Sequence, residues 1–312
     1  MLANLLLVAG QVLTLFLLMG VGFFLARRGQ LTAPGLAQMT HVLLYVVSPC
    51  VVVDALAQAE RSPALMASIL WCFPALIVSY VIYALLAIPL YPKLPRDTRD
   101  ALRMGTIYGN TGFMGIPLIS GVLGQAAMPY CTVGLGVFNI ATWTHGAVLM
   151  GGKENASAKK ALLNPGVLGC AAGFFLFFTG LVMPGPIASA VGFLGSLNTP
   201  LAMLVIGAQM AGADLPATFR RRDLWLASGM KLILLPALTM VLLLPFRLPP
   251  LTYQTLVILS ACPTAGITSI FAQRFGRDPA SAAQLVTLST LLSILTLPMA
   301  AVAAAAVSQC FT

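Results

Sequence analysis

The stretch Tyr108-Gly-Asn-Thr-Gly-Phe-Met-Gly-Ile-Pro117 places three glycines, one proline and two polar side chains inside a long apolar segment. A second stretch, Cys262-Pro-Thr-Ala-Gly-Ile-Thr-Ser269, has the same character. Glycine and proline interrupt helices, because glycine leaves the backbone unrestricted and proline lacks an N–H donor. Both stretches therefore predict a helix that is broken partway along its length.

The composition around these stretches indicates a membrane protein. Of 312 residues, 59% are hydrophobic and only 8% are charged. A soluble domain of this size needs a charged exterior, which so few charged side chains cannot supply, so we expect membrane lipid around the protein. The net charge is +9, but the basic residues are scattered between apolar runs and form no single surface, so we expect no nucleic-acid partner.

The apolar runs provide for ten membrane-spanning helices, each of which needs about 20 residues. One span each falls in 1–26, 29–53, 62–92, 224–246, 248–273 and 279–312, and two spans each fall in 104–152 and 161–213. With this count, 14 of the 17 Lys and Arg residues lie in odd-numbered loops. The positive-inside rule then predicts a multi-pass protein of the plasma (inner) membrane, with the odd loops in the cytoplasm and both termini outside.

A cut after the fifth span predicts two halves, residues 1–150 and 165–312, joined by a short cytoplasmic connector at 151–164. Because five is odd, the second half enters the membrane from the opposite side, as in an inverted repeat. Ser48-Pro49 in span two and Thr199-Pro200 in span seven interrupt corresponding helices. We therefore predict an all-α polytopic membrane protein with ten transmembrane helices in two inverted five-helix repeats.

The two broken stretches belong to spans four and nine, and both fall near the middle of the bilayer. At about 1.5 Å per residue, the first lies about 10 to 20 Å from the cytoplasmic boundary and the second starts about 18 Å from the outer one. Unwound backbone survives in a membrane only against protein or a hydrated cavity, so the breaks should face each other across a binding site. The alternative is that Gly and Pro simply kink these helices.

At these residues the sequence resembles the auxin efflux carrier family, which includes bacterial carriers annotated for malonate and other small organic acids. The matching pieces are Gly109 to Leu118, Lys231 to Pro236 and Cys262 to Gly276, continuing to Ser289 to Pro298. The resemblance implies crossing broken helices four and nine, with spans 3–5 and 8–10 moving as an elevator. It also implies a scaffold of spans 1, 2, 6 and 7 that often dimerises, so we expect a homodimer.

The resemblance implies that substrate binds at the crossing of the two broken segments. The substrate-binding residues it marks are Asn110, Thr111, Gly112 and Pro117 in the first segment, with Gly115 between them, and Pro263, Thr264, Gly266 and Ser269 in the second.

Three other polar residues inside the spans each have two interpretations. Asn139 in span five either faces the crossing or bonds between helices. Lys231 either extends to the headgroups or supplies positive potential to a cavity. Asp54 either makes a local bond near the outer surface or takes part in proton coupling.

We therefore predict a secondary transporter or facilitator for a small organic anion, working by alternating access, with H⁺ or Na⁺ as a possible coupling ion. A channel or a membrane ligand sensor with the same fold is the alternative. The six cysteines lie in apolar stretches without CxxC spacing, so we expect no metal site. No nucleophile–base set or carboxylate pair appears at one depth, so we expect neither an enzyme nor a cofactor.

Overall fold

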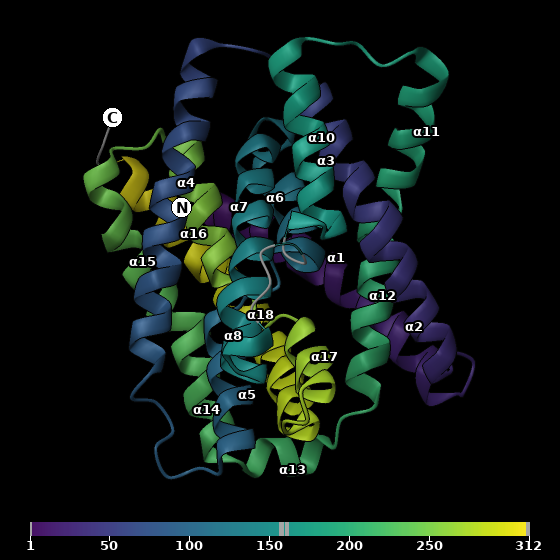
Figure 1. Ribbon diagram of the computed structural model, residues 1–312, viewed down its shortest axis with the longest axis vertical. Coiled ribbons are helices and arrows are strands. Elements are labelled where there is room, and N and C mark those ends of the chain that lie inside the picture. Colours follow the sequence, from purple (N-terminus) through teal and green to yellow (C-terminus); the bar gives the residue numbers. More distant parts are fainter. Residues whose placement is uncertain (1, 156–158, 160–161, 310–312) are drawn as a thin grey trace.

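The computed structural model describes residues 2–155, 159 and 162–309, and it is almost entirely helical (Figure 1). Helices make up 84% of it, and within the described ranges the only β-type pairing is an isolated bridge between Gly109 and Thr264. The predicted all-α class is confirmed. The surface suits the membrane lipid that the sequence predicts, because large apolar side chains such as Phe24, Leu70 and Leu295 are more than half exposed.

Seven helical segments among the described residues are long and apolar enough to cross a membrane. Several contain a π-helical or 3₁₀ turn that does not interrupt the rod. They are α1 (Leu2–Arg27); α2 (Ala33–Val42), η1 (Leu43–Val47) and α3 (Ser48–Ala57); α4 (Pro63–Ala87); η3 (Gln125–Ala127), α7 (Met128–Ala141), η4 (Thr142–Gly146) and α8 (Ala147–Gly151); α11 (Gly185–Ser196) and α12 (Asn198–Ala211); α14 (Arg222–Gly229), η6 (Met230–Leu234), α15 (Leu235–Leu243) and η7 (Leu244–Phe246); and α18 (Pro279–Ser308).

Shorter helices occupy the positions of predicted spans four, six and nine. Span four consists of α5 (Arg96–Ile107) followed by η2 (Thr111–Gly115) and α6 (Ile116–Leu123), and span nine of α16 (Pro250–Ala261) followed by α17 (Ile267–Arg274). α10 (Pro165–Thr179) stands for span six and is about 22 Å long, less than a bilayer core.

The start of span four differs from the prediction. The predicted run starts at residue 104, whereas α5 begins eight residues earlier, at Arg96. This first half-helix is amphipathic, with charged residues on one side and buried residues such as Leu102 and Met104 on the other, so its charges do not end it. The other elements are η5 (Lys153–Asn155) and α13 (Leu215–Arg220), and residues 156–158, 160 and 161 of the predicted connector lie outside the described residues.

Two close helix pairs form one side of the bundle. α1 packs along α12 and α3 packs along α10. A Cβ at Gly22 would lie 2.1 Å from the Leu204 carbonyl oxygen, and a Cβ at Gly207 would lie 1.9 Å from that of Met19. Glycine therefore lets the backbones of α1 and α12 approach closely, which is a common way for membrane helices to associate.

The other side of the bundle contains α4–α8 and α14–α18, whose basic ends are joined by polar contacts. Arg277 donates to Asp97 at 2.7 Å and lies 3.8 Å from Asp100, both on α5. Thr98 donates to Asp278 at 2.8 Å. Burial raises the pKa of Asp278, but the hydrogen bonds from Ser281 and Thr98 outweigh it and hold the pKa below its usual range. These bonds connect α5 to the start of α18.

Candidate functional site

The first break lies between α5 and η2, at Tyr108, Gly109 and Asn110. Asn110 is the N-cap of the second half-helix, and its side-chain oxygen accepts a hydrogen bond from the Phe113 N–H at 3.2 Å. Asparagine is among the best residues for this position, because its oxygen satisfies an N–H that the helix itself cannot. The cap therefore fixes where the second half-helix begins.

The second break lies between α16 and α17 and includes Cys262 to Gly266. Pro263 cannot donate to an α-helical ladder, so α16 ends at Ala261. Thr264 is fully buried, and its N–H donates to the Ser289 hydroxyl at 3.1 Å. This bond holds the unwound segment against α18.

The two breaks pair with each other, as the sequence predicts. The Asn110 N–H donates to the Pro263 carbonyl at 2.6 Å, and the Ala265 N–H donates to the Tyr108 carbonyl at 3.0 Å. The Thr264 hydroxyl donates to the Gly105 carbonyl at 2.9 Å. These bonds satisfy backbone groups that would otherwise be unpaired inside the bundle, so each break is stabilised by the other.

A cavity of about 120 Å³, here called the crossing cavity, adjoins the paired breaks. Three helix N-termini line it: Asn110, Gly112 and Phe113 from η2, Ala265 to Ile267 from the start of α17, and Asn164 to Gly166 from the start of α10. The first N–H groups of a helix have no partner within the helix, and the N-terminus carries a partial positive charge. The remaining lining residues are Leu44, Tyr45, Ser48, Leu135, Phe138, Asn139 and Trp143.

The polar side chains of the crossing cavity are uncharged, and half of them are amides. The amide nitrogen of Asn110 makes no hydrogen bond with any described residue, whereas that of Asn139 donates to the Leu135 carbonyl at 2.9 Å. Asn164 caps α10 by accepting from the Gly166 N–H at 2.8 Å. The Trp143 indole N–H is buried without a partner among the described residues. The cavity is therefore rich in donors, and no described Asp or Glu lines it.

Lys231 lies directly behind the crossing, in η6. Its side chain is 1% exposed, and its ammonium donates to the Ser260 carbonyl at 2.9 Å, in the last turn of α16. A Cβ on Gly109 would lie 2.7 Å from Lys231 Nζ and 3.0 Å from the Cys262 carbonyl oxygen, so a larger residue there would have to displace the ammonium. The sequence interpretation that Lys231 extends to the headgroups is wrong, because the ammonium is fully enclosed at the negative end of a half-helix.

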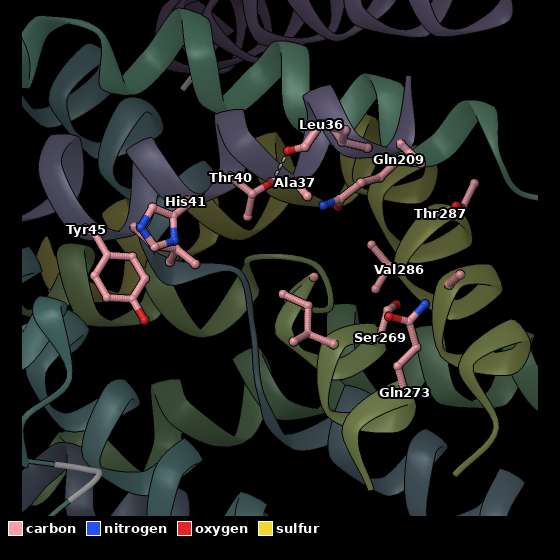
Figure 2. A pocket seen from close by; sticks show the side chains of 15 residues that line it. Leu36, Ala37, Thr40, His41, Tyr45, Gln209, Ser269, Gln273, Val286 and Thr287 are labelled. Carbon is pink, nitrogen blue, oxygen red and sulfur yellow. Dashed lines mark hydrogen bonds between the residues drawn. The ribbon is translucent and has the colours of Figure 1, made fainter. Parts of the chain in front are cut away.

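A larger cavity of about 520 Å³, the vestibule, leads toward the crossing from the end of the bundle that holds Arg27, Arg28 and Arg220 to Arg222. Figure 2 shows Thr40, His41 and Tyr45 on one side of it and Ser269 and Gln273 on the other. The vestibule and the crossing cavity share Leu44, Tyr45 and Gly266 as lining residues. These three residues therefore form the throat between the two spaces.

The structure separates the residues that the sequence placed at one site. Asn110, Gly112, Asn139 and Gly266 line the crossing cavity, and Ser269 lines the vestibule. The remaining predicted residues lie elsewhere: Thr111 and Lys231 line a space of about 20 Å³ behind the crossing, Gly115 packs against Leu259, Pro263 and Thr264 form the pairing, and Pro117 and Asp54 line a cavity at the opposite end.

Asp54 makes the local bond that one of its two interpretations described. Its carboxylate accepts a hydrogen bond from the Gln58 side chain one turn later, at 2.7 Å. It lies at the end of α3, away from both the crossing cavity and Lys231.

Sequence reasoning missed Tyr45, Trp143, Asn164 and Gln209. For Asn164 a signal was available, because Asn followed by Pro is typical of a helix N-cap and first turn. For the other three no local pattern distinguishes them from ordinary residues of a membrane helix.

Two comparisons with known proteins bear on this site. The family model described as "Membrane transport protein" matches residues 7–161 and 155–301. The uncharacterized transporter MJ1031 of Methanocaldococcus jannaschii is 23% identical over 306 residues, which cover 92% of this chain and 96% of that relative. The two family matches meet within the short region between the predicted halves.

Proposed function

The chain belongs to the membrane transport protein family, the family of the auxin efflux carriers, and from that premise we propose that it is a secondary transporter of a small organic anion such as a carboxylate. The observation that carries the choice of an anion is the crossing cavity, where three helix N-termini meet and no described carboxylate is present. Each N-terminus contributes roughly half a positive charge.

The uncharged donors and the buried cation favour the same class of substrate. The Asn110 amide nitrogen has no partner among the described residues, so it is free to donate to a carboxylate oxygen. Lys231 lies on the other side of the same few backbone residues and has no acidic partner within the described part of the chain. An anion in the crossing cavity would balance this charge across a distance of one backbone strand.

The proposed architecture has ten spans in two inverted repeats. Seven long helices, the two broken helices and α10 supply ten segments in the predicted order. The pairing of α1 with α12 and of α3 with α10 brings spans one and seven, and spans two and six, together in matching ways. We assign these helices to the scaffold, and α4–α8 with α14–α18 to the moving elevator unit, which the Arg277 and Thr98 contacts join into one body.

In the proposed cycle, the structure is open toward the basic end, which we assign to the cytoplasm, so that both termini lie outside. This direction of opening is supported by the throat, because the vestibule shares Leu44, Tyr45 and Gly266 with the crossing cavity as lining residues. The cavity at the opposite end shares no lining residue with it. Alternating access would close the first route and open the second.

Flux into proteoliposomes tests the mechanism. A thermal-shift screen of carboxylates on the purified protein first selects the anion. Saturable uptake of that anion, with counterflow when the vesicles are preloaded, is the expected result for a carrier. Conductance that does not saturate would instead identify a channel, and binding without flux would identify a sensor.

Asn110 tests the site. We expect Asn110→Ala to abolish binding of the selected anion at the concentrations that saturate the wild type. Because the substitution also removes a helix cap, which typically stabilises by about 1 kcal/mol, Asn110→Asp is the second variant. It keeps the capping oxygen but removes the donor and adds a repelling charge.

Gln254→Ala is the matched control for Asn110, because it removes a partly buried amide of α16 that bonds to Ser308, away from the crossing. Affinity should be unchanged in this control. Wild-type affinity in both Asn110 variants would reject the crossing cavity as the binding site.

A further inference from the structure

A polar cavity of about 240 Å³ lies at the end of the bundle opposite the vestibule, and we call it the Asp54 cavity. Asp54 and Val51 of α3, with residues of α11 and α12, form one wall, and residues of α6, η3 and α7 form the other. It therefore lies between the proposed scaffold and the proposed moving unit. Its polar lining residues besides Asp54 include Ser120, Gln125, Ser196 and Asn198.

The Asp54 cavity is built from the same parts as the vestibule with the two halves exchanged. The vestibule is lined by α2, the end of α12, α17 and the start of α18; the Asp54 cavity is lined by α11, the end of α3, α6 and the start of α7. Gln209 near the end of α12 and Asp54 near the end of α3 are polar residues in comparable places of the two cavities. Under the proposed inverted repeat, the Asp54 cavity is the second mouth of the transport path, and it alone of the two contains a carboxylate.

The charge of Asp54 has no cationic partner among the described residues. None of the ion pairs in that part of the chain includes it, and no described Lys or Arg lines the cavity. One carboxylate oxygen accepts from Gln58 at 2.7 Å, and the other makes no hydrogen bond with a described residue. A carboxylate at the mouth of an anion path repels the substrate unless a cation neutralises it.

Asn198 supplies an independent observation. It lines the same cavity, its side chain is 2% exposed, and neither its amide oxygen nor its amide nitrogen has a partner among the described residues. Buried polar groups of native proteins are nearly always bonded, so an orphaned amide points to a missing ligand. The first-turn position of Asn198 on α12 also keeps this amide close to the interface between the two units.

The remaining polar atoms are oxygens that could join Asp54 and Asn198. Gln125 donates through its nitrogen to Ser120 at 3.1 Å, which leaves its amide oxygen free. Ser196 donates its hydroxyl proton to the Phe193 carbonyl at 2.7 Å, which leaves its oxygen lone pairs available. Carboxylate, amide and hydroxyl oxygens are the ligands that hard cations prefer.

We infer that the Asp54 cavity binds a monovalent metal cation of the size of Na⁺, with the Asp54 carboxylate as its charged ligand and Asn198 as a neutral one. A single carboxylate balances a single positive charge, and no group of three or more His, Cys, Asp or Glu among the described residues could hold a more highly charged metal. The bound cation connects α3 and α12 to η3 through Gln125. It therefore stabilises the arrangement with the vestibule open, which deepens the proposed transport function by naming its coupling ion.

Thermal unfolding of the purified full-length protein, without any organic anion, tests this inference. NaCl is compared with choline chloride at equal ionic strength. We expect Na⁺ to raise the midpoint by about 3 °C when it is tenfold above its Kd, and the rise to saturate. Asp54→Asn should remove the rise, and Glu60→Gln, which removes a carboxylate from the same end of the bundle outside the cavity, should keep it.

The variant Asn198→Ala tests whether Asn198 is a ligand of the cation or only a structural residue. Removing an unpaired buried amide should raise the midpoint in choline, and the increment caused by Na⁺ should fall by at least half. An unchanged Na⁺ increment in this variant, or no increment in the wild type, would overturn the inference. The same holds if only acidification raises the midpoint, because the occupant would then be a proton on Asp54.

The outcome is distinguishable from a failure of the proposed function. A Na⁺ response without anion uptake would remove the transport proposal and leave the cation site. Saturable uptake without a Na⁺ response would remove the cation site and leave the transport proposal.

Discussion

The two half-helices that end at the crossing, α5 and α16, end in chemically different ways. The Gly105 carbonyl near the end of α5 accepts a hydrogen bond from the Thr264 hydroxyl, which belongs to the opposite break. The Ser260 carbonyl near the end of α16 accepts one from the Lys231 ammonium, which belongs to a third helix. The first end is neutral and is closed by its partner, whereas the second receives a full positive charge.

This difference separates two tasks that one crossing has to perform. Neutral hydrogen bonds between the breaks hold the two segments together at little electrostatic cost. The ammonium adds a charge that no protein carboxylate cancels in the described structure, which favours the anionic substrate that we propose. We therefore expect loss of the hydrogen bond to Gly105, at the end of α5, to change mainly stability, and loss of the one to Ser260, at the end of α16, to change mainly transport.

Gly109 lies where the ends of α5 and α16 meet. Substituting it should therefore lower both stability and transport. A Cβ at this position would lie 2.7 Å from Lys231 Nζ and 3.0 Å from the Cys262 carbonyl oxygen, so both the ammonium and the backbone of the second break would have to shift. Gly109→Ala should lower the free energy of unfolding by about 3 kcal/mol, the upper end for overpacking. Denaturation of the purified protein measures this.

Gly112→Ala is the control for Gly109, because its Cβ would meet only the flexible Leu135 side chain, at 3.2 Å. Its loss should stay below about 1 kcal/mol. Equal losses in the two variants would mean that the contact with Lys231 does not constrain the crossing.

Lys231→Met removes the charge while keeping most of the volume. We expect the rate of anion uptake at low substrate to fall 10- to 100-fold, which corresponds to about 1.4 to 2.8 kcal/mol. The unfolding midpoint should change little, because the desolvation cost of a buried ion disappears along with its hydrogen bond. Lys93→Met, at an exposed position, should leave uptake unchanged; a marked fall there would indicate a general effect of net charge.

Thr264→Val tests the neutral end and should have the smallest effect. It removes the hydrogen bond to Gly105 with little change of shape, so we expect a loss of about 1 kcal/mol in stability and unchanged affinity for the anion. Thr255→Val is the matched control, because the Thr255 hydroxyl bonds only within its own helix, to Leu251. A greater loss of affinity than of stability at Thr264 would place this residue in the binding site instead.

The positions of the two breaks could be predicted from the sequence, because a helix break is a local feature. Gly109, Asn110 and Pro263 interrupt helices for reasons that lie within a few residues of each, and pairing of the two breaks follows from the requirement to satisfy unwound backbone in a membrane. The roles of the individual residues at the breaks were harder to predict from the sequence. Thr111, next to Asn110, lies on the other side of the segment, because a one-residue step turns the side chain away.

The residues that were missed belong to helices that reach the crossing from a distance. Asn164 begins α10, and Trp143 lies in η4, yet both line the same small cavity as Asn110. Whether a tryptophan or an asparagine of one membrane helix lies beside a break in another depends on how the helices are rotated and how deep they start. Neither the rotation of a helix nor the depth at which it starts can be read from the local sequence pattern.

The amino acids alone decide that this chain belongs in lipid and that two of its helices must break, because hydropathy and the backbone limits of glycine and proline act over a few neighbouring residues. The packing of the folded chain decides the rest: that a third helix N-terminus joins the two breaks, and that the ammonium of Lys231 is enclosed behind them instead of reaching the membrane surface. A side chain's partner and exposure depend on segments far away in the sequence, and these are brought into place only when the whole bundle assembles.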